Sequence, residues 1–217
     1  MARYTEAVCK ICRREGEKLF LKGQRCLSPK CPFDRPNDKM RDYPPGEHGK
    51  SGMLRRSRVS DYSRQLRAKQ KTRHVYGILE RQFRRYFARA LKVRGLTGLN
   101  LLQMLELRLD NVVFRMGMAE NRTSARQMVA HGHFLVNGRR SNIPSMLLKP
   151  SDVVSVREQS RKNSIFKDMA EVADKRNCAI WLERNLKDLS CRVLRLPERG
   201  EIDGNLNEQL VVEYYSR

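Results

Sequence analysis

Four cysteines lie close together near the start of the chain, in residues 9–31, with the spacing C-x2-C-x13-C-x4-C. This segment contains few large apolar side chains, and a segment with so small a core usually needs a disulfide or metal to hold it together. Two close pairs of cysteines can direct four thiolates to one point, which is the tetrahedral donor set that zinc prefers. We therefore predict one structural zinc ion with all four positions filled, bound by Cys9, Cys12, Cys26 and Cys31.

Other uses of these cysteines are less compatible with the sequence. A redox Cys-x-x-Cys pair needs a strand-to-helix junction, and no such pattern follows. Four unrelated buried cysteines are a second alternative. The chain starts without the apolar stretch of a secretory signal, which predicts a cytoplasmic protein with reduced thiols rather than disulfides. Cys178 and Cys191, much further along the chain, are expected to be ordinary small apolar residues.

The charge of the chain points to a polyanionic partner. Lys and Arg number 45 against 24 Asp and Glu, a net charge of +21. Residues 1–98 carry +17 of this, residues 99–167 carry +6 and residues 168–217 carry −2. Such an excess attracts nucleic acid or an anionic membrane surface. No run of 18 apolar residues is present, so we expect no membrane span.

Two basic segments follow the cysteines. Residues 34–58 are rich in Pro, Gly and basic residues without periodicity, which indicates either an arm that becomes ordered on nucleic acid or a solvated linker. Residues 78–94 instead have helical periodicity. Leu79, Phe83, Tyr86, Phe87, Ala90 and Leu91 form the apolar face, and Arg81, Arg85, Arg89 and Lys92 form a basic face. A merely solvated face would contain more acidic partners, but residues 62–105 contain only Glu80.

Residues 100–167 have the pattern of a compact module. An apolar stripe predicts a helix over residues 101–116, and Asn121 is a plausible N-cap for a second helix that ends before Gly132. Asn137-Gly138 is a hairpin turn signal between two short strands, and residues 151–158 predict a third strand. The module is therefore expected to be two helices on a small antiparallel sheet. After it, the pattern predicts packing in residues 168–197 and then a strand or extended tail at the end of the chain.

Several stretches together carry a family resemblance. The stretches "RLDNVVFRMGMA", "ARQMVAHGHFLVNGRRSNIP", "YPPGEHG", "ERQFRRYF" and "IDGNLNEQLVVEYYSR" resemble the bacterial S-four family of small-subunit ribosomal proteins. The cysteine segment is similar to that of zinc-containing members. The chain departs from the family pattern in the additional residues "RPNDKMR" and in Ser151, where a glycine is usual.

The resemblance implies an α+β fold with a zinc-clipped, mostly helical domain and a smaller RNA-binding domain. The first would comprise residues 1–98 plus about 199–217, with the C-terminal tail returning to it. The second would comprise residues 99–198 and contain the S-four-type module at about 104–167. The implied partners are small-subunit (16S-type) rRNA, ribosomal proteins S-five and S-three, and mRNA near its path into the subunit. Early assembly of the subunit body, translational accuracy and repression of its own message are the implied roles.

The residues expected to bind RNA are mostly basic, and the resemblance adds the motif residues of the module. They are Arg13, Arg14, Lys22, Arg55, Arg56, Arg58, Arg64, Arg67, Lys69, Lys71, Arg73, Arg81, Arg84, Arg85, Arg89, Arg108, Asp110, Arg115, Arg122, Arg126, His131, Gly132, Asn137, Gly138 and Arg139. No catalytic residues, small-molecule substrate or membrane partner are predicted. The alternatives are a free-standing RNA-binding regulator and an rRNA-modification factor that uses the same module.

Overall fold

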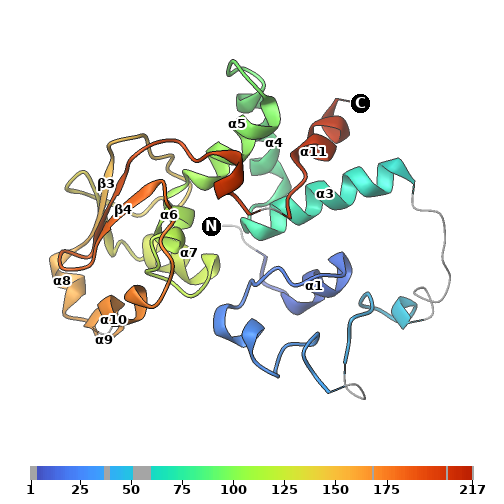
Figure 1. The fold of residues 1–217 in the computed structure, drawn as a ribbon, viewed down its shortest axis with the longest axis horizontal. Helices are drawn as coiled ribbons and strands as arrows, with labels where there is room; N and C mark the ends of the chain where they lie inside the picture. The colour runs from blue at the N-terminus through green and yellow to red at the C-terminus, as the bar shows by residue number, and fades with distance from the viewer. Residues whose placement is uncertain (1–3, 37–39, 51–59, 168, 204, 217) are drawn as a thin grey trace. The chain divides into compact units, whose positions relative to one another are not determined.

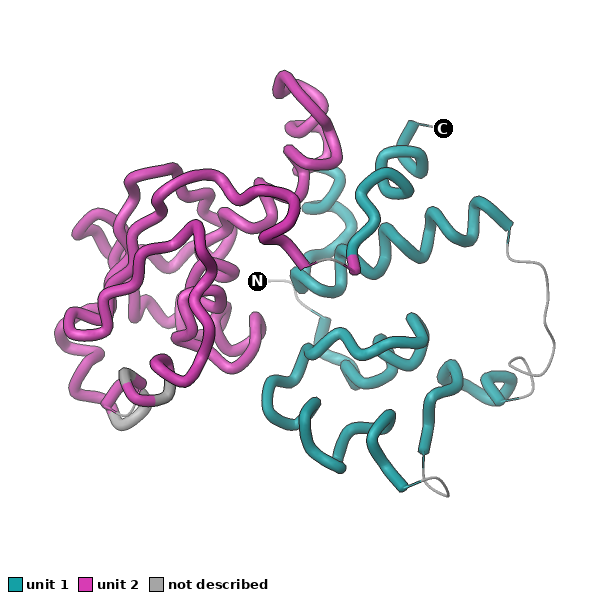
Figure 2. Tube along the Cα trace, in the orientation of Figure 1, with its two compact units in different colours: residues 1–85, 206–217 teal, residues 86–205 magenta. Residues whose placement is uncertain are grey.

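The structure is a computed structural model, and it describes residues 4–36, 40–50, 60–167, 169–203 and 205–216. The chain forms two compact units (Figure 2). Unit 1 comprises residues 1–85 and 206–217, and unit 2 comprises residues 86–205. The sequence placed the boundaries at residues 98 and 198, whereas the contacts of the chain place them at residues 85 and 205.

Unit 1 is helical. Its elements are α1 (Cys9–Glu15), the 3-10 helix η1 (Gly23–Leu27), α3 (Asp61–Val75), the first half of α4 (Glu80–Ala90) and α11 (Glu208–Tyr215). The Ser60 side chain caps α3 by accepting a hydrogen bond from the Ser63 N–H at 3.3 Å. The last helix, α11, lies beside α3 although the two are far apart in sequence (Figure 1).

The expectation of a strand or extended tail at the C-terminus was wrong, because residues 208–215 are helical. Asn207 caps this helix, its side chain accepting from the Leu210 N–H at 3.2 Å. The Tyr215 hydroxyl donates to Glu80 Oε1 at 2.8 Å, and its ring stacks on Phe83 at 6.2 Å. Buried Lys69 donates to the same carboxylate at 2.9 Å. These contacts fix the C-terminal helix within unit 1.

Unit 2 combines helices with one sheet. Its helices are the second half of α4, α5 (Thr97–Glu106), α6 (Leu109–Arg115), α7 (Arg122–Ala130), α8 (Glu158–Arg161), α9 (Ser164–Lys167), α10 (Met169–Asp174) and the 3-10 helix η3 (Arg199–Glu201). Its strands are β1 (Phe134–Val136), β2 (Arg139–Ser141), β3 (Val153–Val156), β4 (Leu182–Asn185) and β5 (Ser190–Val193).

The sheet is antiparallel with the order β2-β1-β3-β5-β4. The predicted hairpin is confirmed, with Val136 opposite Arg139 and positive φ values of 49° at Asn137 and 77° at Gly138. Its turn is tied to the third strand, because the Val153 N–H donates to Asn137 Oδ1 at 2.8 Å. Strands β4 and β5 were not predicted from the sequence, which indicated only that residues 168–197 contain apolar side chains that pack against the rest of the protein.

The core of unit 2 lies among α6, α7 and the sheet, with Phe134, Met116 and Trp181 completely buried. The single helix expected over residues 101–116 is instead two helices, α5 and α6. Between them Arg108 is extended, with φ −68° and ψ 138°. The chain there forms a bridge to Leu147, and the Leu109 N–H donates to the Met146 carbonyl at 2.9 Å. The pairing with residues 146–147 therefore interrupts the helix.

Candidate nucleic-acid interface

Helix α4 separates an apolar face from a basic one, as its periodicity predicted. Phe83, Tyr86, Phe87 and Ala90 are buried, whereas Arg81, Arg84, Arg85 and Arg89 are exposed. One expectation was wrong: the helix ends at Ala90, so Leu91 does not join the apolar face and is 57% exposed. Arg84 forms a 3.3 Å ion pair with Glu80 one turn earlier. Arg81, Arg85 and Arg89 extend from the helix as a basic stripe.

Four of the cations of α3 form ion pairs with carboxylates of the protein. Lys69 pairs with Glu80, and Arg73 lies 3.7 Å from the same carboxylate. Arg67 pairs with Glu15 at 3.4 Å, and Lys71 pairs with Glu17. These four side chains join α3 to α4 and to Glu15 and Glu17 at and just after the end of α1, and we therefore do not assign them to the RNA-binding surface. Arg64 is exposed, with an exposed partner in Asp61, and remains a candidate.

The predicted cations near the N-terminus have different surroundings. Arg13 donates to the carbonyls of Tyr43 and Pro44 at 2.9 and 3.3 Å, and its guanidinium lies 4.8 Å from the Tyr43 ring centre. It therefore anchors the "YPPGEHG" segment. Arg14 is exposed, and Lys22 is half-buried. The predicted contacts Arg55, Arg56 and Arg58 lie outside the described residues.

In unit 2, the most buried of the predicted RNA contacts is Arg108. Its side chain is fully buried, and it donates to both carboxylate oxygens of Asp110, at 3.0 and 2.6 Å. A third nitrogen donates to the Tyr86 hydroxyl at 2.9 Å. Arg126 contacts the same carboxylate at 2.9 Å. Arg108 and Asp110 cannot reach RNA in this arrangement, so we reassign both to the interior.

A second buried carboxylate organises the neighbouring arginines. Glu106 is fully buried and accepts from Arg115 at 2.9 and 2.7 Å and from Asn111 at 2.6 Å. Arg122 donates to Asn111 and to Asp203, at 2.7 and 3.0 Å. Burial would raise the pKa of Asp203, but the guanidinium groups of Arg122 and Arg115 outweigh it and hold that pKa below its usual value. Arg115 and Arg122 thus tie helices together and expose little charge.

The exposed polar surface of unit 2 lies at the end of α7 and on the hairpin. His131, Asn137, Gly138, Arg139 and Arg140 are all exposed. The guanidinium of Arg140 covers Gly132, where an added Cβ would lie 2.5 Å from Arg140 Nε. Gly132 also has a φ of 73°, which favours glycine. Its role is therefore to permit this backbone and the position of Arg140. The predicted RNA contacts include Arg139 but not its neighbour Arg140, for which the Arg-Arg pair beside the turn was the available signal.

His133, close to this surface, has limited access to solvent. Its Nδ1 lies 3.0 Å from the Ser160 hydroxyl, and its ring packs edge-on to Phe166 at 5.4 Å. Burial lowers the pKa of His133, and the neighbouring His131, Arg140 and Arg157 lower it further. His133 therefore adds little to the positive charge of this surface, which the exposed Arg139 and Arg140 supply.

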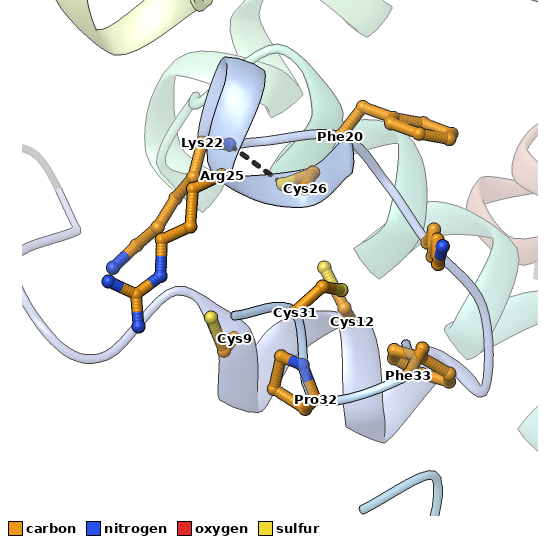
Figure 3. Close-up of a pocket in the computed structure, with 10 residues that line it drawn as sticks. Cys9, Cys12, Phe20, Lys22, Arg25, Cys26, Cys31, Pro32 and Phe33 are labelled. Atoms are coloured by element: carbon orange, nitrogen blue, oxygen red, sulfur yellow. Dashed lines mark hydrogen bonds between the residues drawn. The ribbon is translucent and has the colours of Figure 1, made fainter. Parts of the chain in front are cut away.

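The four N-terminal cysteines line one hollow, together with Phe20, Phe33 and three basic residues (Figure 3). Cys9 and Cys12 come from one face of α1, Cys26 from η1, and Cys31 from the turn that follows. Burial raises the pKa of the Cys12 thiol, and the other three cysteines are near enough to add to that effect. The thiols are nevertheless spread apart: among the described residues, no three His, Cys, Asp or Glu side chains form a group that could hold a metal ion.

The described helices include none that is both long enough and apolar enough to cross a membrane. The exposed arginines on α4 and on the hairpin of unit 2 favour the class of nucleic-acid-binding proteins.

Comparison with known protein families identifies the family within this class. Residues 3–106 match the ribosomal protein S4/S9 N-terminal domain, and residues 107–154 match the S4 domain. The chain is 54% identical to the small ribosomal subunit protein uS4 of Pelotomaculum thermopropionicum and 52% identical to that of Halothermothrix orenii. It is 48% identical to the uS4 protein of Thermodesulfovibrio yellowstonii, and each of these matches covers 100% of both chains. The chain belongs to the uS4 family.

Proposed function

We propose that this protein is a structural constituent of the small ribosomal subunit that binds 16S-type rRNA directly. The observation that carries this proposal is the exposed stripe of Arg81, Arg85 and Arg89 on α4, a helix whose opposite face is buried. Side chains held in register on a packed helix can meet successive phosphates with little loss of backbone entropy. Family membership over the full length supports the ribosomal role. The family is structural rather than enzymatic, and its site of action is the cytoplasm.

Finer roles extend this proposal. We propose that the protein acts early in assembly of the subunit body and lies beside ribosomal proteins S-five and S-three, near the path of mRNA into the subunit. In the same proposal, the protein contributes to translational accuracy and represses translation of its own message. Family resemblance supports these roles. The match along the whole chain favours a ribosomal protein over a free-standing regulator or modification factor, which would need the small module alone.

The direct test is the salt dependence of rRNA binding. Replacing Arg81, Arg85 and Arg89 by Gln removes three exposed charges. Each arginine that no longer neutralises a phosphate lowers the slope of log affinity against log salt by roughly one. We therefore expect the triple variant to bind small-subunit rRNA with a slope smaller by about three. Filter binding across a salt series would measure it.

A matched control removes three exposed charges elsewhere. Lys175, Lys187 and Arg192 are exposed in residues 168–205, the part of unit 2 where acidic residues outnumber basic ones, and their replacement by Gln makes the same change in net charge. We expect this control to keep the slope of the natural protein. If both variants reduce the slope equally, the effect is one of net charge, and the α4 stripe is not the binding surface.

We further propose one structural zinc ion held by Cys9, Cys12, Cys26 and Cys31. The donor chemistry fits, because four cysteines line one hollow and four thiolates suit tetrahedral zinc. Lys18, Lys22 and Arg25 line the same hollow and would offset the negative charge of a tetrathiolate site. The Lys22 backbone N–H also donates to Cys26 Sγ at 3.4 Å, a contact that would orient this ligand. Zinc binding would draw the thiols closer together than they lie in the structure.

Elemental analysis tests the zinc proposal. Protein purified under reducing conditions without chelator should contain about one zinc per chain, as the four-cysteine donor set predicts. Cys26→Ser should lose the metal and increase hydrogen exchange in residues 4–36 while leaving exchange in the sheet of unit 2 unchanged. Cys191→Ser is the matched control and should keep its zinc. Metal-free protein with unchanged exchange in residues 4–36 would contradict the proposal.

A further inference from the structure

Phe20 is an aromatic residue that the protein holds at its surface in a strained conformation. It lies between α1 and η1, it is 53% exposed, and its φ of 49° falls in the left-handed region. Residues with a bulky side chain rarely adopt this region, because their Cβ atom then crowds the neighbouring carbonyl oxygen. Strain of this kind persists where the surrounding structure imposes it, and it is concentrated at functional sites. Two unfavourable features, backbone strain and an exposed ring, therefore coincide at this residue.

The exposure of Phe20 is unexpected in a segment with so small a core. Its neighbour Leu19 and Ile11 of α1 are buried, and burying a further aromatic ring would remove a large apolar area from water. The Phe20 ring instead points away from the four cysteines (Figure 3). The left-handed turn at Phe20 presents the ring to solvent while the adjacent leucine remains in the interior.

The surface around Phe20 combines its ring with two cations. Within the residues that the structure describes, neither an aromatic ring nor a cation stacks on Phe20. Lys22 and Arg25 line the same hollow and extend on the side of the turn opposite to the ring (Figure 3). Lys18 nearby pairs with Asp34. Lys22 and Arg25, by contrast, have no carboxylate partner in the described parts of the chain. The ring and the two charges are therefore available to a partner.

An unpaired nucleotide has the two groups that complement this surface. Its base offers a flat π face that stacks on aromatic side chains, and its phosphates carry the negative charge that Lys22 and Arg25 attract. A base within a double helix is already stacked on its neighbours, so it does not offer that face to Phe20. The surface therefore fits a single-stranded loop or bulge of RNA rather than a regular helix.

We propose that Phe20 is a stacking platform for one unpaired base of the RNA, with Lys22 and Arg25 meeting the neighbouring phosphates. The inference rests on the proposed binding of small-subunit rRNA and adds to it a contact that recognises single-stranded structure. It also accounts for the strained backbone, because the left-handed conformation at Phe20 is what directs the ring outward beside the buried Leu19.

Three substitutions at this position distinguish stacking from backbone strain. Phe20→Asn removes the ring and relieves the strain, because asparagine tolerates the left-handed region. Phe20→Leu removes the ring but keeps the strain and the apolar character, and Phe20→Tyr keeps both the ring and the strain. We expect the first two variants to bind small-subunit rRNA about 5- to 100-fold more weakly, the usual effect of losing one base–aromatic stack. The tyrosine variant should bind like the natural protein.

The dependence on salt separates this contact from the phosphate contacts. None of the three substitutions changes a charge, so the slope of log affinity against log salt should remain that of the natural protein. Arg25→Gln should instead lower the slope by about one. Ile180→Asn removes an apolar side chain that is 76% exposed in unit 2. It is the matched control, and we expect it to leave both affinity and slope unchanged.

Filter binding, together with hydrogen exchange in residues 4–36, decides among the outcomes. If the natural protein binds rRNA and the Asn and Leu variants bind it equally well, the stacking proposal is overturned while direct rRNA binding stands. Natural protein that does not bind rRNA would overturn both. Weaker binding found only in a variant whose residues 4–36 exchange faster would make Phe20 a structural residue, and this result would also overturn the stacking proposal.

Discussion

An individual arginine in this chain is either exposed, where it can meet a phosphate, or buried against a carboxylate of the protein. Residue type alone does not show which of the two applies. Arg81 is exposed on α4, whereas Arg108 is completely buried between Asp110 and Tyr86. An unpaired guanidinium in the interior would be strongly unfavourable, so Arg108 and its carboxylate must be understood as one unit. This explains why Asp110 stands among the arginines of residues 108–126: it binds Arg108 and Arg126.

We expect Asp110→Asn to destabilise unit 2 by about 3 kcal/mol, because it leaves the buried Arg108 without its charge partner. The chain contains one tryptophan, Trp181, which is buried in unit 2. Its fluorescence during urea unfolding therefore reports on the stability of this unit. Glu120→Gln removes the acid of a long, partly exposed pair with Arg176 in the same unit and should change stability by less than about 0.5 kcal/mol. Equal effects of the two changes would refute the assignment of Arg108 to the interior.

His74 predicts a pH dependence for unit 1. Burial lowers its pKa to about 4, and Arg73 and Arg67 add to the effect. A group whose pKa is lower in the folded state stabilises the fold above its unfolded pKa of about 6.5, and that stability is lost as the pH falls toward the folded pKa. We therefore expect unit 1 to lose stability between about pH 6.5 and pH 4.

Comparison with His74→Asn isolates this contribution. Hydrogen exchange in α3 at increasing urea, corrected for the intrinsic exchange rate at each pH, would give the urea midpoint of unit 1. This midpoint should fall more steeply with decreasing pH in the natural protein than in the variant. Glu15, whose pKa is raised by burial, acts in the opposite direction, but it is present in both proteins and cancels in the difference. Identical pH profiles would mean that His74 becomes protonated without cost.

At the scale of elements, the predictable parts were those with strong local signals. Three elements were predicted correctly: α4 from its periodicity, the start of α7 from the Asn121 cap, and the hairpin from its Asn-Gly turn. Each of these signals is encoded within a few neighbouring residues. The Asn121 side chain accepts from the Ser124 N–H at 2.8 Å, as expected for a cap. The candidate surface of α4 followed from the same periodicity.

Elements determined by distant partners were not predictable. Residues 208–215 are rich in residues that favour strands, yet they form α11 because their tyrosines contact α3 and α4. Likewise the bridge to Leu147 interrupts the helix expected over residues 101–116. The sequence also could not show which arginines have acidic partners, because Asp203 is far from Arg115 and Arg122 along the chain.

The anchoring of α11 gives a prediction at this scale. Tyr215→Phe keeps the ring stacked on Phe83 but removes the hydrogen bond to Glu80. We expect a loss of about 1.5 to 3 kcal/mol, since the acceptor is charged, and faster hydrogen exchange throughout α11. Tyr4→Phe, which removes a longer and exposed hydrogen bond of 3.4 Å to Glu6, is the control and should have little effect. If α11 exchanges at the same rate in both variants, this hydroxyl does not anchor the helix.

The charge of the whole molecule is shared more evenly between the two units than between the halves of the sequence. Unit 1 contains 24 basic and 11 acidic residues, a net charge of +13, and unit 2 contains 21 and 13, a net charge of +8. Three cations of α3, Arg67, Lys69 and Lys71, also form ion pairs within unit 1. Net charge is therefore a poor guide to phosphate binding, and the exposed arginines must be compared directly.

A pair of double variants makes that comparison. Arg81→Gln with Arg85→Gln removes two charges from a regular helix, and we expect the salt slope for rRNA binding to fall by about two. Arg139→Gln with Arg140→Gln removes two charges from the hairpin of unit 2, where Arg140 is held over Gly132. Side chains read double-helical RNA mainly through its backbone and shape. We expect the hairpin variant to show a smaller fall in slope than the helix variant but to bind small-subunit rRNA less selectively against an unrelated RNA of equal length. The opposite result, with selectivity reduced in the helix variant alone, would place recognition on α4 and leave the hairpin with only a phosphate-binding role.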